Sequence, residues 1–340
     1  MLGKRFCKQI AWSVFVYLLS LVPQGQIYAQ DLNEMMRENA QKDKTIMIEE
    51  GVTFQDYIKM ANREVETVLH DTELENRQQA HENLNKIMAQ MLVMPQADTF
   101  EFEKHLIGIS VQKPDDGKFA IFTWQFYVDD NTYLYGGYMR MKNRTLFRLD
   151  DKSKEHTQPF DLRLRHTNWY GALYYRIMPF KYDGKQMYLL FGYNAHSFFA
   201  RRKLLDVLYF ENDKPRFGYK VIEMKDGRGV KRTVSRFILE YSASVAVTLN
   251  YSEIDKMILY DHLVGGSPIE GGGTLNIPDG SYCGLRLEKG KWVYVDKVHE
   301  DVYDPQTSWN NPTAPTPNPI FDNKKSKETD IFGKNKKKGK

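Results

Sequence analysis

The spacing of hydrophobic positions predicts helices in the first part of the chain. Between residues 54 and 68, apolar side chains recur at intervals of three and four residues, which places them on one face of an amphipathic helix. Thr72 followed by Glu75 fits a capping box that opens a second helix, and Pro95 follows the end of that helix. We expect a helical N-terminal region over residues 30–96. Its apolar faces either pack on the rest of the protein or form a docking surface for a partner.

Over residues 97–304 the hydrophobic period changes from that of a helix to that of a strand. Aromatic and β-branched runs are separated by short turn clusters, and Phe122, Trp124 and Phe126 alternate with less apolar neighbours. Consecutive runs joined by short turns favour antiparallel pairing. The sequence therefore predicts a mainly β protein, with an antiparallel β-domain and an α-helical N-terminal extension. A sandwich, a barrel and an irregular propeller are all compatible with this pattern.

The most distinctive run covers residues 169–210. Asp183 and Gly184 separate two aromatic and aliphatic stretches, and Asp-Gly is a strong hairpin signal because both residues accept the positive φ of a type I′ turn. A polar and aromatic loop, residues 193–197, follows the second stretch, and a third strand is expected over residues 204–210. The predicted ligand-binding residues come from this region and from one later strand: Tyr193, Asn194, His196, Arg202, Asp206, Asp261 and His262.

Two of these candidates are carboxylates on apolar strand faces. Asp206 falls on the same strand face as Leu204 and Leu208. Asp261 falls on the same strand face as Leu259 and Leu263. Burying an unpaired carboxylate is costly, so each side chain needs a partner. Either each pairs with an arginine such as Arg202 or Arg236 for structural reasons, or the two act together as the acid and base of a glycosidase-like hydrolase.

Other catalytic signatures are missing from the sequence. The eight histidines and two cysteines form no HExxH, HxH or CxxC pattern, and there is no GxSxG motif. A zinc site assembled from His196, Asp261 and His262 is the remaining metal hypothesis, but dispersed histidines are usually surface or core residues. We therefore predict no catalytic residues of these kinds, no metal and no cofactor. In a β-domain most of the aromatic residues (21 Tyr, 19 Phe and 5 Trp) build the core, and some could line a cleft for a glycan or a peptide.

The N-terminus has the pattern of a secretory signal. Lys4, Arg5 and Lys8 precede an apolar stretch over residues 11–22, and Ala29 offers a small residue for cleavage. We expect a signal peptide over residues 1–29 and export to the periplasm or the cell surface. Cleavage would leave Cys283 as the single cysteine, so no intrachain disulfide could form.

The C-terminus differs in composition from the rest of the chain. Residues 305–322 are rich in Pro and Asn, which predicts an extended linker, and residues 323–340 form a lysine-rich tail expected to be disordered. Subtracting +6 for this tail and +3 for the signal from the total charge of +4 leaves −5 for residues 30–322. This balance argues against a nucleic-acid partner. The tail could instead bind an anionic membrane surface through its lysines, among them Lys324, Lys325, Lys336, Lys337 and Lys338.

Several short motifs also resemble a group of uncharacterised exported proteins from the Bacteroidetes. They span about residues 95–300 and include Phe122-Thr123-Trp124, Trp169-Tyr170-Gly171-Ala172, Leu190-Phe191-Gly192-Tyr193-Asn194, Tyr260-Asp261-His262-Leu263 and Pro278-Asp279-Gly280. The resemblance implies an exported Gram-negative protein and brings no activity with it.

Taken together, these patterns favour a non-enzymatic binding or interaction module of the cell envelope, with an envelope protein or a glycan as its partner. The alternative is the hydrolase that would use Asp206 and Asp261 as paired carboxylates.

Overall fold

The computed structural model describes residues 51–129, 132–225, 229–265 and 276–299, which belong to one compact unit beginning at Gly51. The predicted signal segment (1–29), linker (305–322) and lysine-rich tail (323–340) lie outside the described residues. Residues 30–50 and 300–304 lie outside them too.

The helical segment covers residues 54–105, slightly beyond the predicted boundary. It comprises α3 (Phe54–His70), α4 (Leu74–Val93), a 3-10 turn η1 (Pro95–Asp98) and the single turn α5 (Phe102–His105). The capping box opens α3, where Thr53 and Asp56 cap each other, whereas α4 begins after Glu73 without a side-chain cap. The prediction of a capping box at Thr72 is therefore wrong, because the N-cap position of α4 is occupied by Glu73, one residue after Thr72. None of the described helices is long and apolar enough to span a membrane.

The described strands form three sheets. The helix-side sheet has the order β1 (Ser110–Gln112), β2 (Phe119–Asp129), β3 (Thr132–Met141), β4 (Leu146–Arg148). The central sheet has the order β5 (Leu164–Arg165), β9 (Lys214–Phe217), β8 (Ala200–Glu211), β7 (Lys185–Asn194), β6 (Leu173–Tyr182), with β12 (Arg236–Ser242) also paired to β8. The outer sheet has the order β11 (Lys231–Val234), β10 (Ile222–Lys225), β16 (Lys291–His299), β15 (Asn276–Glu288), β14 (Met257–Gly265), β13 (Leu249–Ser252).

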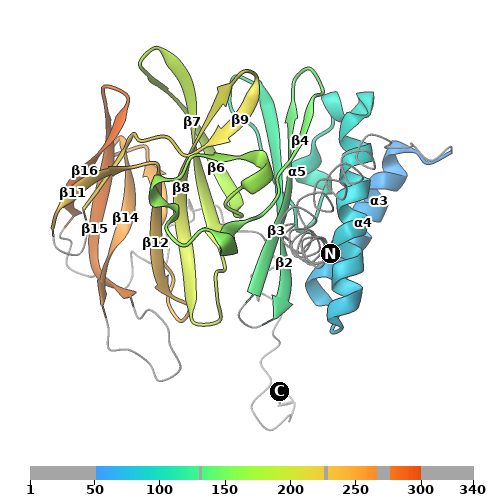
Figure 1. Cartoon of the computed structure of the whole chain (residues 1–340), viewed down its shortest axis with the longest axis horizontal. Helices are drawn as coiled ribbons and strands as arrows, with labels where there is room; N and C mark the ends of the chain where they lie inside the picture. Colours follow the sequence, from blue (N-terminus) through green and yellow to red (C-terminus); the bar gives the residue numbers. More distant parts are fainter. Residues whose placement is uncertain (1–50, 130–131, 226–228, 266–275, 300–340) are drawn as a thin grey trace, which may run out of the picture. The chain divides into compact units, whose positions relative to one another are not determined.

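The three sheets and the helices stack in four layers with a hydrophobic core at each interface (Figure 1). The two-residue period of each strand produces this arrangement. On β2, Phe122 and Trp124 pack against α3 and α4, while Ile121 faces the central sheet. On β7, Leu190 faces the helix-side sheet and Leu189 faces the outer sheet. The apolar faces of α3 and α4 thus pack on the helix-side sheet and form part of the hydrophobic core.

The predicted fold class is confirmed: the protein is mainly β, rich in antiparallel sheets, with a helical N-terminal segment. Asp183 (φ 49°) and Gly184 (φ 71°) form the two-residue turn between β6 and β7, as the Asp-Gly signal predicted. One pairing among the described strands is parallel, between Ile222 of β10 and Trp292 of β16. Cys283 is a free thiol buried in the core between the central and outer sheets.

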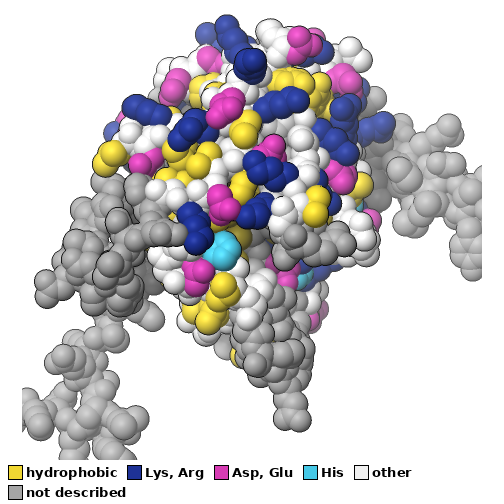
Figure 2. Space-filling model, turned by 90° about the vertical axis from the view of Figure 1, so that its left-hand side faces the viewer, with side chains coloured by type: hydrophobic (Ala, Val, Ile, Leu, Met, Phe, Trp, Pro, Cys, Tyr) yellow, Lys and Arg dark blue, Asp and Glu magenta, His cyan; other side chains and the backbone are white. Residues whose placement is uncertain are grey.

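Figure 2 looks onto the side of the molecule formed by the outer sheet. Basic and acidic side chains are interspersed there with hydrophobic ones. Among the exposed hydrophobic residues of this sheet are Val264, Ile277 and Leu287, each close to 40% exposed. The mixture of signs gives this face no uniform charge.

Candidate functional site

Two pockets lie at opposite ends of the β7–β8 pair. One involves Asn194 at the end of β7 and Arg202 near the start of β8, and we call it the Arg202 pocket. The other involves Lys185 at the start of β7 and Glu211 at the end of β8, and we call it the tyrosine pocket. Asn194 is nine positions beyond Lys185 along an extended strand, which places these two residues about 30 Å apart.

The Arg202 pocket has a volume of about 210 Å³ and brings together side chains from four segments of the chain. Its lining residues are Ser153, Lys154, His156, Thr157, Tyr170, Asn194, His196 and Arg202. Two cations and two imidazoles are present in this set, and no carboxylate is.

Arg202 is fixed by strand register and hydrogen bonds. It lies opposite Asn194 on β7 and opposite Glu240 on β12. Its Nε and Nη2 contact Oε2 of Glu240 at 2.7 and 2.6 Å, and its Nη1 donates to the Tyr170 hydroxyl at 2.8 Å. The guanidinium group is therefore held in one position at the pocket wall.

His196 lies in the loop between β7 and β8, in the left-handed backbone region (φ 48°). Its backbone N–H donates to Oδ1 of Asn194 at 2.8 Å, and Nδ2 of Asn194 donates to the Gly171 carbonyl at 2.6 Å. Burial, with the positive charge of Arg202 added to it, lowers the pKa of His196 to about 4. The imidazole is therefore neutral at pH 7.

Lys154 borders the same pocket from the 3-10 turn η2 (Ser153–Glu155), and its Nζ donates to the His196 carbonyl at 2.8 Å. Its pKa is lowered by burial and, next, by Arg202. The two cations thus act on each other across the pocket.

Asp151 fixes the wall behind the pocket. Its carboxylate accepts hydrogen bonds from the backbone N–H groups of Tyr135 (2.9 Å), Ser153 (2.8 Å) and Gly171 (3.1 Å). Burial raises the pKa of this carboxyl. One side chain therefore ties three segments of the chain together at the pocket wall.

The structure brings Asn194, His196 and Arg202 together, and it places the other four sequence candidates elsewhere. Asp206 is completely buried on the face of β8 that packs toward the helix-side sheet, in an ion pair with Arg236. The Arg236 guanidinium lies over the Tyr170 ring at 5.3 Å, so Asp206 is connected to the Arg202 pocket only through the core.

The remaining candidates are dispersed. Tyr193 precedes Asn194 on β7, so its side chain points to the opposite face, and it is absent from the lining of either pocket. Asp261 belongs to the outer sheet and accepts a hydrogen bond from the Thr248 N–H. His262 is exposed and lies 2.8 Å (Nδ1) from Oδ2 of Asp279.

The central sheet therefore lies between Asp206 and Asp261, and the two carboxylates share no cleft. An acid and a base must both reach one substrate bond, so this arrangement gives no support to a paired-carboxylate mechanism. Within the described ranges, no group of three or more His, Cys, Asp or Glu side chains is placed to hold a metal ion.

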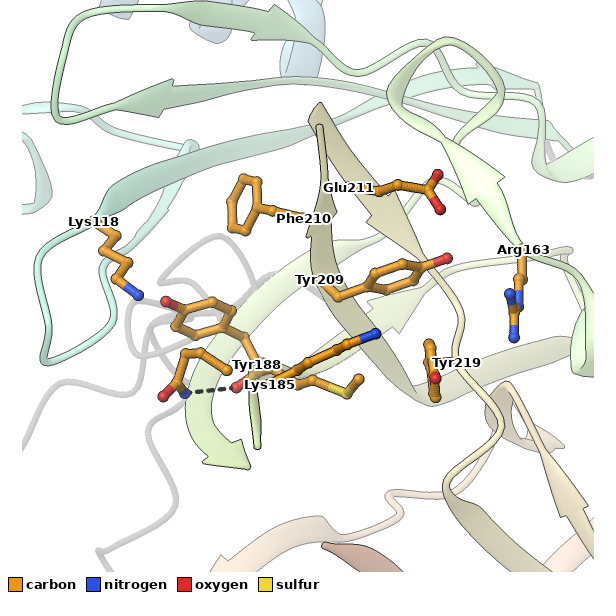
Figure 3. Close-up of a pocket in the computed structure, with 10 residues that line it drawn as sticks. Lys118, Arg163, Lys185, Tyr188, Tyr209, Phe210, Glu211 and Tyr219 are labelled. Atoms are coloured by element: carbon orange, nitrogen blue, oxygen red, sulfur yellow. Dashed lines mark hydrogen bonds between the residues drawn. The ribbon is translucent and has the colours of Figure 1, made fainter. Parts of the chain in front are cut away.

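The tyrosine pocket is larger, with a volume of about 430 Å³ (Figure 3). Aromatic side chains form much of its wall: Tyr188, Tyr209, Phe210 and Tyr219. The Tyr209 and Tyr219 rings meet edge to face, with centroids 5.1 Å apart and planes at 81°. Arg163 lies over the Tyr219 ring, with its guanidinium carbon 5.0 Å from the centroid.

Four charged side chains line this pocket, and two of them are neutralised by neighbours. Lys118 lies 3.7 Å from Asp116, and Glu211 lies 3.0 Å from Arg216. Arg163 and Lys185 are exposed, and no ion pair to either is found within the part of the chain that the structure describes. In Figure 3 the side chains of Tyr209, Lys185, Tyr219 and Arg163 follow one another across the pocket. The site therefore combines aromatic surface with two uncompensated positive charges.

The pattern of the sequence did not identify this pocket. Its residues come from the starts of β2 and β7, the end of β8, and the segments around Arg163 and Tyr219. Each of these segments has an ordinary strand or turn sequence. Arg163 and Lys185 come together only in the folded protein, so their combined positive charge has no signal in the sequence. Comparison with protein-family models, with curated proteins and with solved structures found no match to this chain.

Proposed function

We propose that this protein is an exported, non-enzymatic binding module of the cell envelope, and that the tyrosine pocket holds an acidic saccharide. The observation that carries the proposal is the pairing of Arg163 and Lys185, two cations without carboxylate partners among the described residues, with the Tyr209 and Tyr219 rings in one cavity.

The size and shape of the pocket favour a saccharide. A cavity of about 430 Å³ falls in the range of small-molecule sites. A sugar ring can place its C–H face on one aromatic ring and its hydroxyl groups against polar edges, which suits two tyrosines at 81°. A nucleobase would instead gain most from parallel rings on both faces, and Tyr209 and Tyr219 are not parallel.

The charges favour an acidic group on that saccharide. A carboxylate or sulfate beside Lys185 and Arg163 would gain charge-assisted hydrogen bonds, which contribute about 1.5–3 kcal/mol each. The guanidinium carbon of Arg163 lies 5.0 Å from the centroid of the Tyr219 ring, a cation–π contact that places this cation beside the aromatic wall of the pocket.

Export and the cell-envelope location rest on the sequence of residues 1–29 and on the lysine-rich tail. Both lie outside the described residues. The hydrolase alternative has no observation in its favour, because Asp206 is sealed against Arg236 and Asp261 belongs to another sheet.

The test is a calorimetric titration of the full-length protein with acidic and neutral oligosaccharides. We expect an acidic oligosaccharide to bind, and Lys185→Ala or Arg163→Ala to weaken it at least tenfold. Tyr219→Ala should weaken it by a similar factor. Lys181→Ala is the matched control, since Lys181 is exposed in the same hairpin and is absent from the pocket lining. If no acidic saccharide binds, or if the Lys185 and Lys181 variants bind equally well, the proposal is wrong.

A further inference from the structure

We propose that the tyrosine pocket is one of two adjoining subsites, so that the ligand is a saccharide chain and not a single sugar. The proposal rests on the function given above and adds a second sugar unit to it. The acidic unit lies in the pocket beside Arg163 and Lys185, and the neighbouring unit, which is uncharged, lies on Tyr182.

The first support is a row of aromatic rings that continues beyond the pocket. Tyr209 and Tyr219 line the pocket with their ring centroids 5.1 Å apart. Tyr182 is absent from the lining, and its ring centroid lies 5.7 Å from that of Tyr219, with the planes at 61°. Each of these steps is comparable to the length of one sugar unit. Saccharide chains twist from unit to unit, so rings with different tilts can receive successive units.

The second support is the place where the pocket opens. The pairing of β7 with β8 ends at Tyr188 and Leu208. Beyond this point Lys185 pairs with Tyr182 on β6, whereas the last residues of β8 pair with β9. Residues directly opposite each other in an antiparallel pair share one face of the sheet, so Tyr182 lies on the same face as Lys185. A chain that leaves the pocket along this hairpin therefore meets Tyr182 next.

The third support is the position of the Tyr182 side chain. The turn between β15 and β16 lies against it, and a Cβ atom added to Gly290 (φ 80°) would lie 2.9 Å from Cα and 3.1 Å from Cδ2 of Tyr182. Tyr182 is half-buried and packs against the core between the central and outer sheets. Its hydroxyl makes no hydrogen bond within the described parts of the chain. The side chain is thus held from one side, and its hydroxyl can bond a sugar hydroxyl group.

The charges around this tyrosine favour an uncharged unit there. The turn between β15 and β16 carries Lys289 and Lys291, and these are balanced by Glu288 of the same turn and Asp183 of the β6–β7 turn. All four are exposed. Lys181, the preceding residue on β6, points to the opposite face of the strand. This second surface therefore has no excess of either charge, and the acidic unit belongs in the pocket.

The experiment is a titration of the full-length protein followed by NMR, which detects weak binding. The two probes are glucuronic acid and a tetrasaccharide in which glucuronic acid alternates with N-acetylglucosamine. We expect the tetrasaccharide to bind about tenfold more tightly than glucuronic acid, because a second aromatic contact is added. Tyr182→Ala should remove this gain and leave the affinity for glucuronic acid unchanged. Tyr182→Phe, which keeps the ring, should retain most of the gain.

Tyr282→Ala is the matched control, because Tyr282 is also half-buried but lies in the middle of β15 and is absent from the pocket lining. If Tyr182→Ala does not fold, Tyr182→Leu removes the aromatic ring while keeping an apolar side chain against the core.

The outcomes separate this inference from the function on which it rests. Equal affinity of the wild type for the two probes would overturn the second subsite and leave the acidic-saccharide pocket standing. A gain that persists in Tyr182→Ala would overturn it too. If Tyr182→Ala weakens both probes equally, the residue supports the pocket and does not receive a second unit. Binding of neither probe, nor of any other acidic saccharide, would contradict the proposed function itself and the second subsite with it.

Discussion

Asp206 and Arg236 lie directly opposite each other on β8 and β12 and form an ion pair from which solvent is completely excluded. Nη2 of Arg236 donates to both carboxylate oxygens, at 3.0 and 2.8 Å, and Nη1 donates to the Pro159 carbonyl at 2.9 Å. Burial raises the pKa of the Asp206 carboxyl, and Arg236 acts in the opposite direction.

This pair predicts an asymmetric response to mutation. Asp206→Asn leaves a buried guanidinium without its counter-charge, and we expect the free energy of unfolding to fall by about 3–5 kcal/mol. Replacing both residues, as Asp206→Leu with Arg236→Met, should cost much less because no buried charge remains. Urea unfolding measures both. Glu101→Gln, which breaks an exposed pair with Lys104, is the control and should cost under about 1 kcal/mol. A loss below about 1 kcal/mol in Asp206→Asn would contradict this account.

A second prediction concerns acid stability and His81. This residue of α4 accepts a hydrogen bond from Nε1 of Trp124 at 3.3 Å and stacks on Phe126. Burial, and then the charge of Arg148, lowers the pKa of His81 to about 4. Above pH 6.5 the imidazole is neutral in both the folded and unfolded chain. As the pH falls from 6.5 to 4, the unfolded chain binds the proton first, so stability is lost across that interval.

The size of the effect is measurable by comparing unfolding at about pH 7 and about pH 4.5. The pKa of about 4 for His81 corresponds to a loss of about 2–3 kcal/mol over this interval, and His81→Leu should remove that part of the loss. Some acid dependence remains in the variant because His196 titrates in the same direction. His70→Gln, at the exposed end of α3, should behave like the wild type. An unchanged pH dependence in His81→Leu would show that another group is responsible.

A third prediction tests the wall of the Arg202 pocket. A Cβ atom at Gly171 would overlap the Asp151 carboxylate, which bonds to the Gly171 N–H itself. We expect Gly171→Ala to destabilise the protein by about 3 kcal/mol, through overpacking and strained hydrogen bonds. Thermal unfolding checks this, with Gly265→Ala as control because a Cβ atom at Gly265 would meet no other atom within 4 Å. Equal midpoints for the two variants would contradict the role given to Asp151.

A fourth prediction addresses the lysine-rich tail, residues 323–340. We propose that it binds anionic lipid surfaces, at about 1 kcal/mol per lysine near the surface. Co-sedimentation with anionic vesicles should be strong at low salt and largely lost near about 1 M salt, where the Debye length is about 3 Å. Neutral vesicles are the control. Unchanged binding after removal of residues 323–340 would show that the tail is not the lipid-binding segment.

The parts of the fold that were predictable are those encoded in local periodicity. The alternation around Trp124 predicted β2, and Asp183 with Gly184 predicted the β6–β7 turn. The stacking of three sheets was not predictable in this way. Strands of the central sheet are buried on both faces, as Leu189 and Leu190 show, and a strand without a polar face carries no signal of what covers it.

The Arg202 pocket was predicted only in part, because only those of its residues that are close in sequence share a local pattern. Asn194, His196 and Arg202 are close in sequence, so one polar loop identified all three. Lys154 and Tyr170 line the same pocket because Asp151 accepts hydrogen bonds from the backbone of their neighbours Ser153 and Gly171. Hydrogen bonds to backbone N–H groups produce no recognisable pattern in the sequence. Asp206 was correctly expected to need a charged partner, and Arg236 provides it. Asp261 is instead bonded to the Thr248 backbone, a partner that side-chain chemistry cannot indicate.

The single parallel pair among the described strands has a consequence for the order of assembly. Because β16 lies between β10 and β15, the outer sheet is completed only when its last strand is inserted between strands made earlier. A nascent or truncated chain that lacks residues 291–299 would carry two additional open sheet edges, on β10 and β15, and would miss Trp292, which packs against Phe180 in the core. Such a chain would be prone to edge-to-edge association. Insertion of β16 thus joins the β10–β11 pair to the β13–β15 strands and covers both of these inner edges at once.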